Sequence, residues 1–226
     1  MDSPNKALYQ INSESKKSQI LSGGSEFDGG KLLAADQENI YLLLAKGIFR
    51  LKVDTSSPDL IIQKDNDWGE ISGLSIFSGN LYLLDKNKNQ IWKYIGNGTD
   101  FSPKTNYLKD NVNLSQVNSL AVDGLVWVDQ NDKILKFIQG NLDNFNIQGL
   151  EKPLGTNLKI FTNQTSKYIY ILDLNNNRVV LIDKEGKYQQ QYKWDNLKDV
   201  SNMEIFEDEK KIFLTSGSKI YEFGVK

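Results

Sequence analysis

Two stretches of the chain place Asp and Asn at alternating positions, a spacing that can surround a metal ion. They are Asp85-Lys86-Asn87-Lys88-Asn89 and Asp173-Leu174-Asn175-Asn176-Asn177. Oxygen ligands at the first, third and fifth positions open a calcium loop, which continues with Gly at the sixth and a bidentate Glu at the twelfth. Here the sixth residue is Gln90 or Arg178, and the twelfth is Gly96 or Lys184. The pattern therefore departs from a calcium loop at both of these positions.

The same residue types also form turns. Asp and Asn side chains bond to nearby backbone groups and tolerate left-handed backbone conformations. We therefore interpret both stretches as structural turns and expect no metal or other cofactor there. Replacement of Asp85 or Asp173 by Ala is then expected to cost about 0.5–2 kcal/mol, the range for loss of a side-chain cap.

A second candidate site combines Trp with carboxylates in two loops. One loop carries Asp67, Trp68 and Glu70, and the other carries Trp194 and Asp195. An aromatic face beside hydrogen-bond acceptors suits a sugar, a cationic group or a peptide side chain. The alternative is that each Trp packs between neighbouring sheets, because Trp is usually buried. We take these five residues as the candidate ligand- or partner-binding residues.

The composition excludes several kinds of chemistry. The chain has no Cys and no His, so it cannot assemble a disulfide, a thiol nucleophile, a Ser-His pair or a His-ligated metal site. We predict no catalytic residues and no enzymatic activity. With 27 basic and 29 acidic residues, the net charge is −2, and we expect no nucleic-acid partner. No apolar stretch is long enough to cross a bilayer, so we expect no direct membrane insertion.

A repeated four-residue pattern indicates the elements that position these candidates. Its copies begin with Leu8-Tyr9-Gln10-Ile11 and end with Ile220-Tyr221-Glu222-Phe223. The four between them are Ile48-Phe49-Arg50-Leu51, Ile91-Trp92-Lys93-Tyr94, Ile134-Leu135-Lys136-Phe137 and Val179-Val180-Leu181-Ile182. The copies recur roughly every 42 residues, a period typical of a four-stranded propeller blade. We predict an all-β propeller, a single domain over residues 1–226.

The blade count follows from the strands around each copy. Two apolar runs precede each of the last five copies, and a more polar run follows each of the first five, so a full unit has an inner, a second, a third and an outer strand. The chain begins with a third-type strand and ends without an outer one. We therefore favour five blades closed by pairing of the N- and C-terminal strands, with six blades as the alternative. We expect a monomer.

Two of the units resemble a known family. Residues 79–91 and 168–180 each contain an aromatic strand, an Asp and an Asn-rich turn, and the second adds Arg178 and a branched residue, as in NHL-type β-propeller repeats. The chain is also similar to propellers at the C-terminal end of larger bacterial membrane proteins, some with a phosphatase or kinase domain. This resemblance implies a sensor or docking module, which could be the extracytoplasmic part of a membrane-anchored protein. The residues themselves leave the compartment open.

Three functions are compatible with these residues. The first is a non-catalytic module that binds a protein segment or a small polar ligand on its loop face, at the central channel. The second is a calcium- or carboxylate-dependent hydrolase or lyase of propeller fold. The third is a structural scaffold. The lack of His and Cys favours the binding module.

Overall fold

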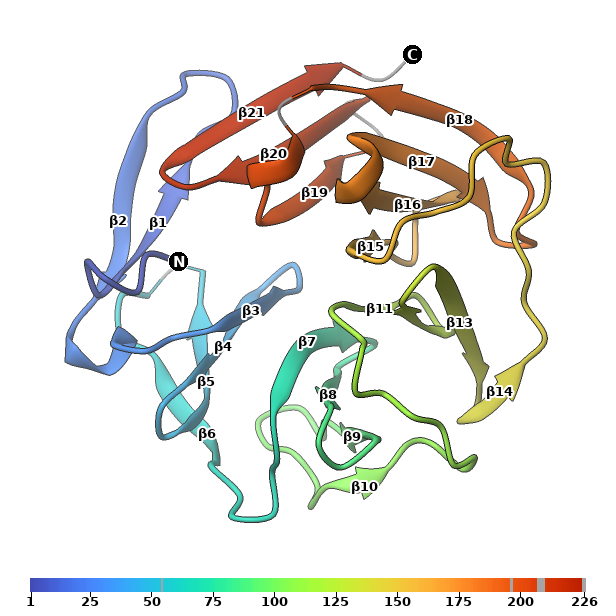
Figure 1. The fold of residues 1–226 in the computed structure, drawn as a ribbon. Coiled ribbons are helices and arrows are strands. Elements are labelled where there is room, and N and C mark those ends of the chain that lie inside the picture. The colour runs from blue at the N-terminus through green and yellow to red at the C-terminus, as the bar shows by residue number, and fades with distance from the viewer. Residues whose placement is uncertain (54, 196, 207–209, 225–226) are drawn as a thin grey trace. The chain divides into compact units, whose positions relative to one another are not determined.

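The computed structural model describes residues 1–53, 55–195, 197–206 and 210–224. Its regular elements are strands, joined by turns and by the 3-10 turns η1 (Ser25–Phe27), η2 (Leu174–Asn176) and η3 (Leu197–Asp199) (Figure 1). The all-β class is therefore confirmed. Among the described residues, no helix has the length and hydropathy required of a membrane span. The chain forms two compact units, Met1–Asn106 and Tyr107–Lys226.

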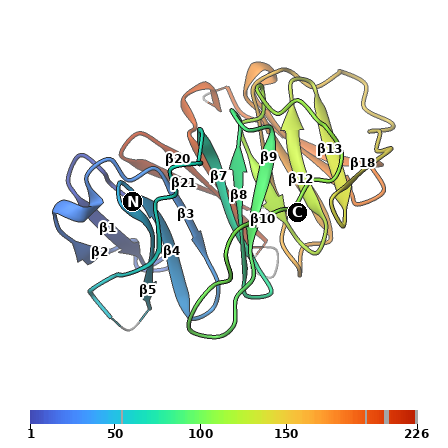
Figure 2. The same cartoon turned by 90° about the horizontal axis from the view of Figure 1, so that it is seen from below.

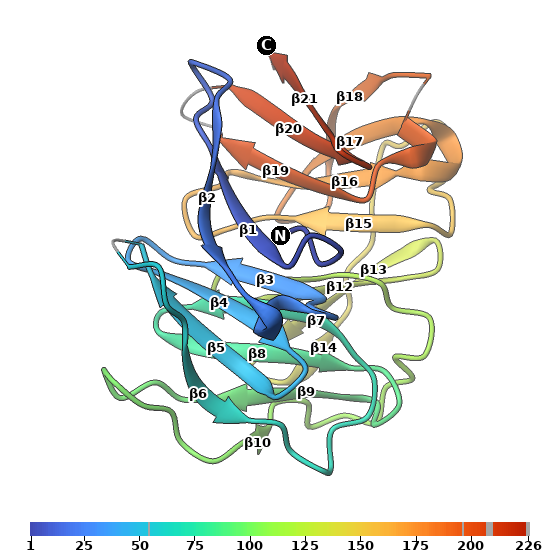
Figure 3. The ribbon, with the colours of Figure 1, turned by 90° about the vertical axis from the view of Figure 1, so that its left-hand side faces the viewer.

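Unit 1 contains a hairpin and two four-stranded sheets. The hairpin joins β1 (Ala7–Ile11) to β2 (Ser18–Gly23). The first sheet contains β3 (Leu32–Ala35), β4 (Asn39–Leu44), β5 (Gly47–Lys52) and β6 (Asp59–Gln63). The second contains β7 (Ile71–Phe77), β8 (Asn80–Asp85), β9 (Gln90–Tyr94) and β10 (Thr105–Asn106). Figure 2 shows β7, β8 and β9 side by side, and Figure 3 shows β3 to β6 in chain order.

Unit 2 contains three sheets. The first contains β11 (Leu120–Val122), β12 (Val126–Gln130), β13 (Lys133–Ile138) and β14 (Asn141–Asp143). The second contains β15 (Leu158–Phe161), β16 (Tyr168–Asp173), β17 (Arg178–Asp183) and β18 (Tyr188–Lys193). The third has three strands, β19 (Asn202–Phe206), β20 (Lys211–Ser216) and β21 (Lys219–Gly224). All neighbouring strands pair antiparallel in chain order.

Burial along each sheet explains why these sequences form blades. The second strands β8 and β16 are buried at five of their six positions, on both faces, as a strand covered by neighbours on each side must be. The fourth strands β6 and β18 have no fully buried residue. Burial therefore falls from the second strand to the fourth, where the sequence has its more polar runs, whereas the first strands β3 and β19 alternate between more and less exposed residues.

The five sheets β3–β6, β7–β10, β11–β14, β15–β18 and β19–β21 are the five blades of a β-propeller fold, as predicted. The fifth blade has three strands, β19 to β21. Strand β1 pairs with β2, and β21 pairs with β20, so the described ladders do not include the predicted pairing of the two chain ends. That closure stays a prediction, as does the single-domain organisation.

Each unit has its own apolar cores. In unit 1 one core joins the first two sheets through Tyr41, Leu43, Trp68 and Trp92. In unit 2 one core lies between the sheets β11–β14 and β15–β18, and a second lies between β15–β18 and β19–β21. These cores fix the strand ends from which the candidate residues project.

Candidate functional site

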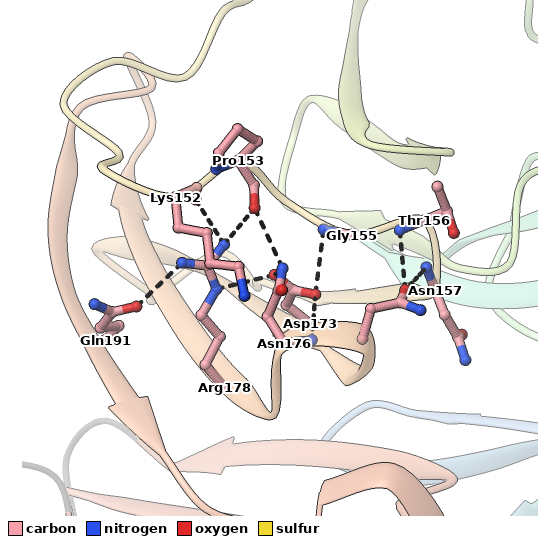
Figure 4. A network of polar contacts seen from close by, with 10 residues as sticks. Lys152, Pro153, Gly155, Thr156, Asn157, Asp173, Asn176, Arg178 and Gln191 are labelled. Atoms are coloured by element: carbon pink, nitrogen blue, oxygen red, sulfur yellow. Dashed lines mark hydrogen bonds and ion pairs between the residues drawn. The ribbon is translucent and has the colours of Figure 1, made fainter.

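The turn after β16 is held by the buried carboxylate of Asp173 (Figure 4). Its Oδ2 accepts hydrogen bonds from Arg178 Nε at 2.9 Å and from Asn176 Nδ2 at 2.7 Å. Its Oδ1 accepts bonds from the backbone N–H groups of Asn176 and Gly155, both at 3.3 Å. The carboxylate therefore connects its own turn to the loop that enters the same sheet.

The Arg178 guanidinium extends this network. The side chain is 2% exposed and the Asp173 side chain 0%, so their contact is a buried ion pair. Arg178 Nη2 donates to the carbonyls of Lys152 at 2.8 Å and Pro153 at 2.7 Å, and Nη1 donates to Gln191 Oε1 at 3.2 Å. A buried charge requires such partners. Arg178 thus joins the turn, the entering loop and the outer strand β18.

The two asparagines of the alternating pattern also have local roles. Asn175 Oδ1 accepts the backbone N–H groups of Thr156 and Asn157, at 3.0 and 2.7 Å. Asn177 adopts a left-handed backbone with φ of 50°, which Asn tolerates better than most residues. The Asn175 side-chain oxygen and the left-handed backbone of Asn177 therefore stabilise a turn.

The equivalent turn in unit 1 uses different donors. Asp85 Oδ2 accepts the backbone N–H of Gly69 and the indole Nε1 of Trp92, both at 2.8 Å. Oδ1 accepts the backbone N–H of Lys88 at 3.2 Å, and Asn89 is left-handed with φ of 50°. A Cβ on Gly69 would lie 2.6 Å from Asp85 Oδ1, so the loop can approach the carboxylate only with glycine there.

A third aspartate, Asp129 at the end of β12, occupies the same place in its sheet. It accepts the backbone N–H groups of Asn118 at 2.8 Å and Ser119 at 2.6 Å, together with both of their side chains. Burial raises the pKa of Asp129, and these hydrogen bonds oppose the rise. The sequence interpretation did not single out Asp129 as a site, because its turn is short and lacks the alternating Asn.

The three aspartates therefore share one structural role, which is to accept backbone N–H groups from the loop entering their own sheet. The residue just before the first bonded N–H is buried in each case: Trp68, Val117 and Leu154. The predicted turn-holding role of Asp85 and Asp173 agrees with these bonds. Within the described residues, no group of three or more acidic side chains is placed to hold a metal ion.

Trp68 is the buried residue that directly precedes Gly69, whose N–H binds Asp85. It is 9% exposed, its Nε1 donates to Tyr94 Oη at 2.9 Å, and its ring meets the Tyr94 ring edge to face. This position corresponds to Leu154, another core residue, so the packing alternative describes Trp68. Its predicted contact with a ligand stays a prediction.

The carboxylates beside Trp68 form a charged cluster with two lysines. Lys104 Nζ contacts Asp65 Oδ2 at 2.5 Å and Asp67 Oδ2 at 3.1 Å, and lies 4.9 Å from the centre of the Trp92 ring. Lys88 Nζ contacts Asp67 Oδ1 at 2.8 Å. We call Asp65, Asp67, Lys88, Lys104 and Trp92 the Lys104 cluster.

Electrostatics keep the Lys104 cluster ionised. The hydrogen bond from Lys104 lowers the pKa of Asp65, and the bond from Lys88, followed by that from Lys104, lowers the pKa of Asp67. Partial burial alone would lower the pKa of Lys104, but its bonds to both aspartates outweigh this and raise it. The cluster thus holds an ammonium between two carboxylates and an aromatic ring.

The remaining predicted residues lie apart from this cluster. Glu70 is exposed, and its carbonyl accepts the backbone N–H of Lys86 at 3.0 Å. In unit 2, Trp194 is half-buried, with its ring centre 4.8 Å from those of Tyr221 and Phe223. Asp195, next to it, is exposed. Asp67, Trp68 and Glu70 therefore belong to one loop of unit 1, and Trp194 and Asp195 belong to unit 2.

Two titratable side chains on first strands of unit 2 were not singled out from the sequence. On β19, Glu204 alternates with the buried Met203 and Ile205, and on the neighbouring β15, Lys159 alternates with buried apolar residues. The surrounding protein raises the pKa of Glu204 to about 7 and lowers that of Lys159. Glu204 is nevertheless exposed, so water reaches its carboxyl and limits the shift.

No family model matches the sequence, and no curated protein matches it. Among solved structures, the chain is similar to a gluconolactonase from Xanthomonas campestris. The TM-score is 0.72 at 13% identity, over 100% of this chain and 81% of that one. It is also similar to virginiamycin B lyase from Staphylococcus aureus, with a TM-score of 0.60 at 14% identity over 99% of this chain and 79% of that one.

A third similar structure comes from a nidogen–laminin complex. The TM-score is 0.62 at 15% identity, over 84% of this chain and 73% of that one. At such identities the likeness shows the fold alone. The chain has the β-propeller fold. Of the three similar structures, two are enzymes and one comes from a protein complex.

Proposed function

We propose that this chain is a non-catalytic binding module. Its ligand is a protein segment or small polar molecule that carries a cationic group, and it docks on the loops that lead into the first strand of a sheet. In unit 1 these loops carry Asp67 and Glu70, and in unit 2 they carry Trp194 and Asp195. Finer assignments, namely the NHL-type family and a place in a larger membrane-anchored bacterial protein, are part of this proposal and rest on the resemblance of two repeats.

The Lys104 cluster is the observation that carries the proposal. Two carboxylates and an aromatic face are the groups that bind an alkylammonium ion, and here the chain's own lysine shows that they accept one. Asp67 remains 56% exposed, so a ligand can reach it without unfolding the loop. An incoming cation would exchange with Lys88 at little cost, because the Lys88–Asp67 pair is exposed and exposed ion pairs are weak.

The three buried carboxylates at the turns are already engaged by the chain itself. Asp85, Asp129 and Asp173 each accept bonds from the chain's own donors, so none is free to bind a substrate proton or a metal ion. A variant of virginiamycin B lyase with one histidine replaced by alanine is described as catalytically inactive. This chain has no histidine with which to supply such a group.

Binding of simple charged probes tests the proposal. The probes are a fluorescein-labelled decapeptide of alternating Lys and Ser and its Glu counterpart, titrated with the intact chain and followed by anisotropy at low salt. We expect the Lys probe to bind and the Glu probe not to. Asp67→Asn should weaken binding about threefold, the scale of one exposed ion pair. Lys104→Ala should strengthen binding, because it removes the competing ammonium.

The control for this titration is Asp59→Asn, which changes the net charge equally at an exposed position of β6 outside the cluster. If Asp59→Asn and Asp67→Asn weaken binding to the same extent, attraction is general and the site is wrong. Equal binding of the Lys and Glu probes would also contradict the proposal. Thermal melts of each variant separate loss of binding from loss of fold.

A carboxylate-dependent hydrolase is the second candidate, favoured by one observation. The pKa of the Glu204 carboxyl is raised toward the neutral range that suits proton transfer, to an extent that its exposure limits, and its strand β19 contacts β15, the strand that carries Lys159. Hydrolysis of gluconolactone in a pH-stat tests this function, because a similar fold is a gluconolactonase. Activity that Glu204→Gln abolishes, without a change in melting temperature, would favour the enzyme over the binding module.

A further inference from the structure

The connection between β9 and β10 contains the one Asn-Gly pair of the sequence, Asn97-Gly98. The chain reverses direction here. Gly96 pairs antiparallel with Phe101, and the Asn97 N–H donates to the Asp100 carbonyl at 3.0 Å. All four residues from Asn97 to Asp100 are exposed. Water therefore reaches this loop without any opening of the fold.

The backbone nitrogen of Gly98 is available as a nucleophile. Among the described hydrogen bonds, none uses the Gly98 N–H. The residue has a φ of 99°, which glycine adopts readily, and a Cβ there would meet no atom of a more distant residue within 4 Å. An exposed, unpaired nitrogen that carries no neighbouring side chain can approach the amide carbon of the preceding residue, Asn97.

The Asn97 side-chain carbonyl is polarised by the same loop. Its Oδ1 accepts the backbone N–H of Asp100 at 3.0 Å. When a nitrogen adds to Cγ, negative charge develops on this oxygen, and a backbone N–H held beside it stabilises that charge. The loop thus combines an unpaired nucleophile with a polarised carbonyl on adjacent residues.

We propose that Asn97 is a site of spontaneous covalent modification, in which the backbone nitrogen of Gly98 attacks Cγ of Asn97. Hydroxide first takes the proton from the Gly98 N–H. The new N–Cγ bond then forms as the Cγ–Nδ2 bond breaks, and the departing nitrogen takes a proton from water and leaves as ammonia. Water opens the resulting succinimide ring at either carbonyl, which gives aspartate or isoaspartate. The sum is one water consumed and one ammonia released, with no oxidation or reduction.

The modified loop contacts a neighbouring sheet of unit 1. Arg50 Nη1, on β5, donates to the Thr99 carbonyl at 2.9 Å, and among the described residues the guanidinium makes no other hydrogen bond. Isoaspartate lengthens the main chain by one methylene two residues before this carbonyl, and both products add a negative charge. The reaction therefore changes the loop that receives Arg50. It requires no ligand and is independent of the Lys104 cluster.

Timed incubation of the intact chain, followed by peptide mapping in a mass spectrometer, tests the proposal. Asn12 is an internal control. It is exposed, and its Oδ1 accepts the N–H of Ser15 at 2.7 Å, but Ser13 follows it in place of glycine. We expect Asn97 to convert at least about tenfold faster than Asn12, because a Cβ on the next residue hinders approach of its nitrogen. The rate should rise with pH, and isoaspartate should form beside aspartate.

A matched pair of variants identifies the nucleophile. Gly98→Ala should slow conversion of Asn97 at least about tenfold and leave that of Asn12 unchanged. Thr99→Ala, one residue further along the loop, should leave both rates unchanged. Conversion of Asn97 that is absent, or no faster than that of Asn12, overturns the proposal in the unmodified chain without any variant. So does a Gly98→Ala chain that converts as fast as the parent, with melting temperatures that agree.

Discussion

The turns at Asp173 and Asp85 perform the same task with different donors. Each carboxylate lies at the end of a second strand and accepts the N–H of a glycine in the entering loop, Gly155 or Gly69. The Asp173 carboxylate also accepts a hydrogen bond from the buried Arg178 cation, whereas the Asp85 carboxylate accepts one from the neutral indole of Trp92. Both turns bury a carboxylate, but only the Asp173 turn also buries a cation, which would be left uncompensated if the carboxylate were removed.

The two turns are similar in sequence but should differ in how much each carboxylate contributes to stability. Both turns have the D-x-N-x-N pattern and the same left-handed fifth residue, Asn177 or Asn89. Their energetics should nevertheless differ, because removal of one partner of a buried ion pair leaves an uncompensated charge. Removal of the acceptor from a neutral donor costs only the desolvation of that donor.

The largest expected effect is therefore that of Asp173→Ala. It strands the Arg178 guanidinium at a site that is 2% exposed, and should lower the free energy of unfolding by about 3–5 kcal/mol. This exceeds the 0.5–2 kcal/mol expected from the sequence, which considered only a turn cap. Urea denaturation measures the loss. The double variant Asp173→Ala, Arg178→Met should recover part of it, and no recovery would show that the ion pair is not its source.

Asp85→Ala should cost less. Trp92 Nε1 and the Gly69 N–H lose a shared acceptor, for which we expect a loss of about 1–3 kcal/mol in the same denaturation experiment. Trp92→Phe serves as the control, since it removes the indole donor and keeps the carboxylate. A cost for Asp85→Ala that equals or exceeds that of Asp173→Ala would break the comparison.

The third aspartate gives a smaller effect that depends on pH. Burial raises the pKa of Asp129 in the folded chain, so the folded state holds the proton more tightly than the unfolded state. Its contribution to stability is complete below the unfolded pKa, and is lost as pH rises through the folded pKa. We expect Asp129→Asn to remove this decline, so that its melting temperature relative to the parent improves as pH rises from about 4 to 7. A difference in melting temperature between Asp129→Asn and the parent that stays constant with pH would contradict a raised pKa of Asp129.

Much of the fold could be predicted from the sequence because local patterns encode it. The repeated apolar motif marks the third strands, and the Asp and Asn residues at positions 85–89 and 173–177 mark two of the turns. Asp129 keeps its place in the repeat, but its shortened turn lacks the alternating Asn, so its bonds from Asn118 and Ser119 could not be predicted from the local pattern.

The candidate site was harder to predict because its contacts are distant in sequence. Lys104 reaches back to Asp65 across 39 positions, and no local pattern joins them. Trp68 precedes the glycine that binds Asp85, as Leu154 precedes Gly155, and comparison of these loops would have indicated a core residue. Arg178 was noticed for its position in the turn, but its bonds to the carbonyls of Lys152 and Pro153 need the folded loop.

The most direct test of the central claim is a calcium titration of the melting temperature. If Asp85 and Asp173 are occupied by the chain's own donors, millimolar calcium should leave the melting temperature of the parent unchanged relative to chelator. A ligand that binds only the folded state would raise it, by an amount that grows with concentration. The account predicts no rise. A rise in the parent that disappears in Asp85→Ala or Asp173→Ala would contradict it and would make these turns metal sites.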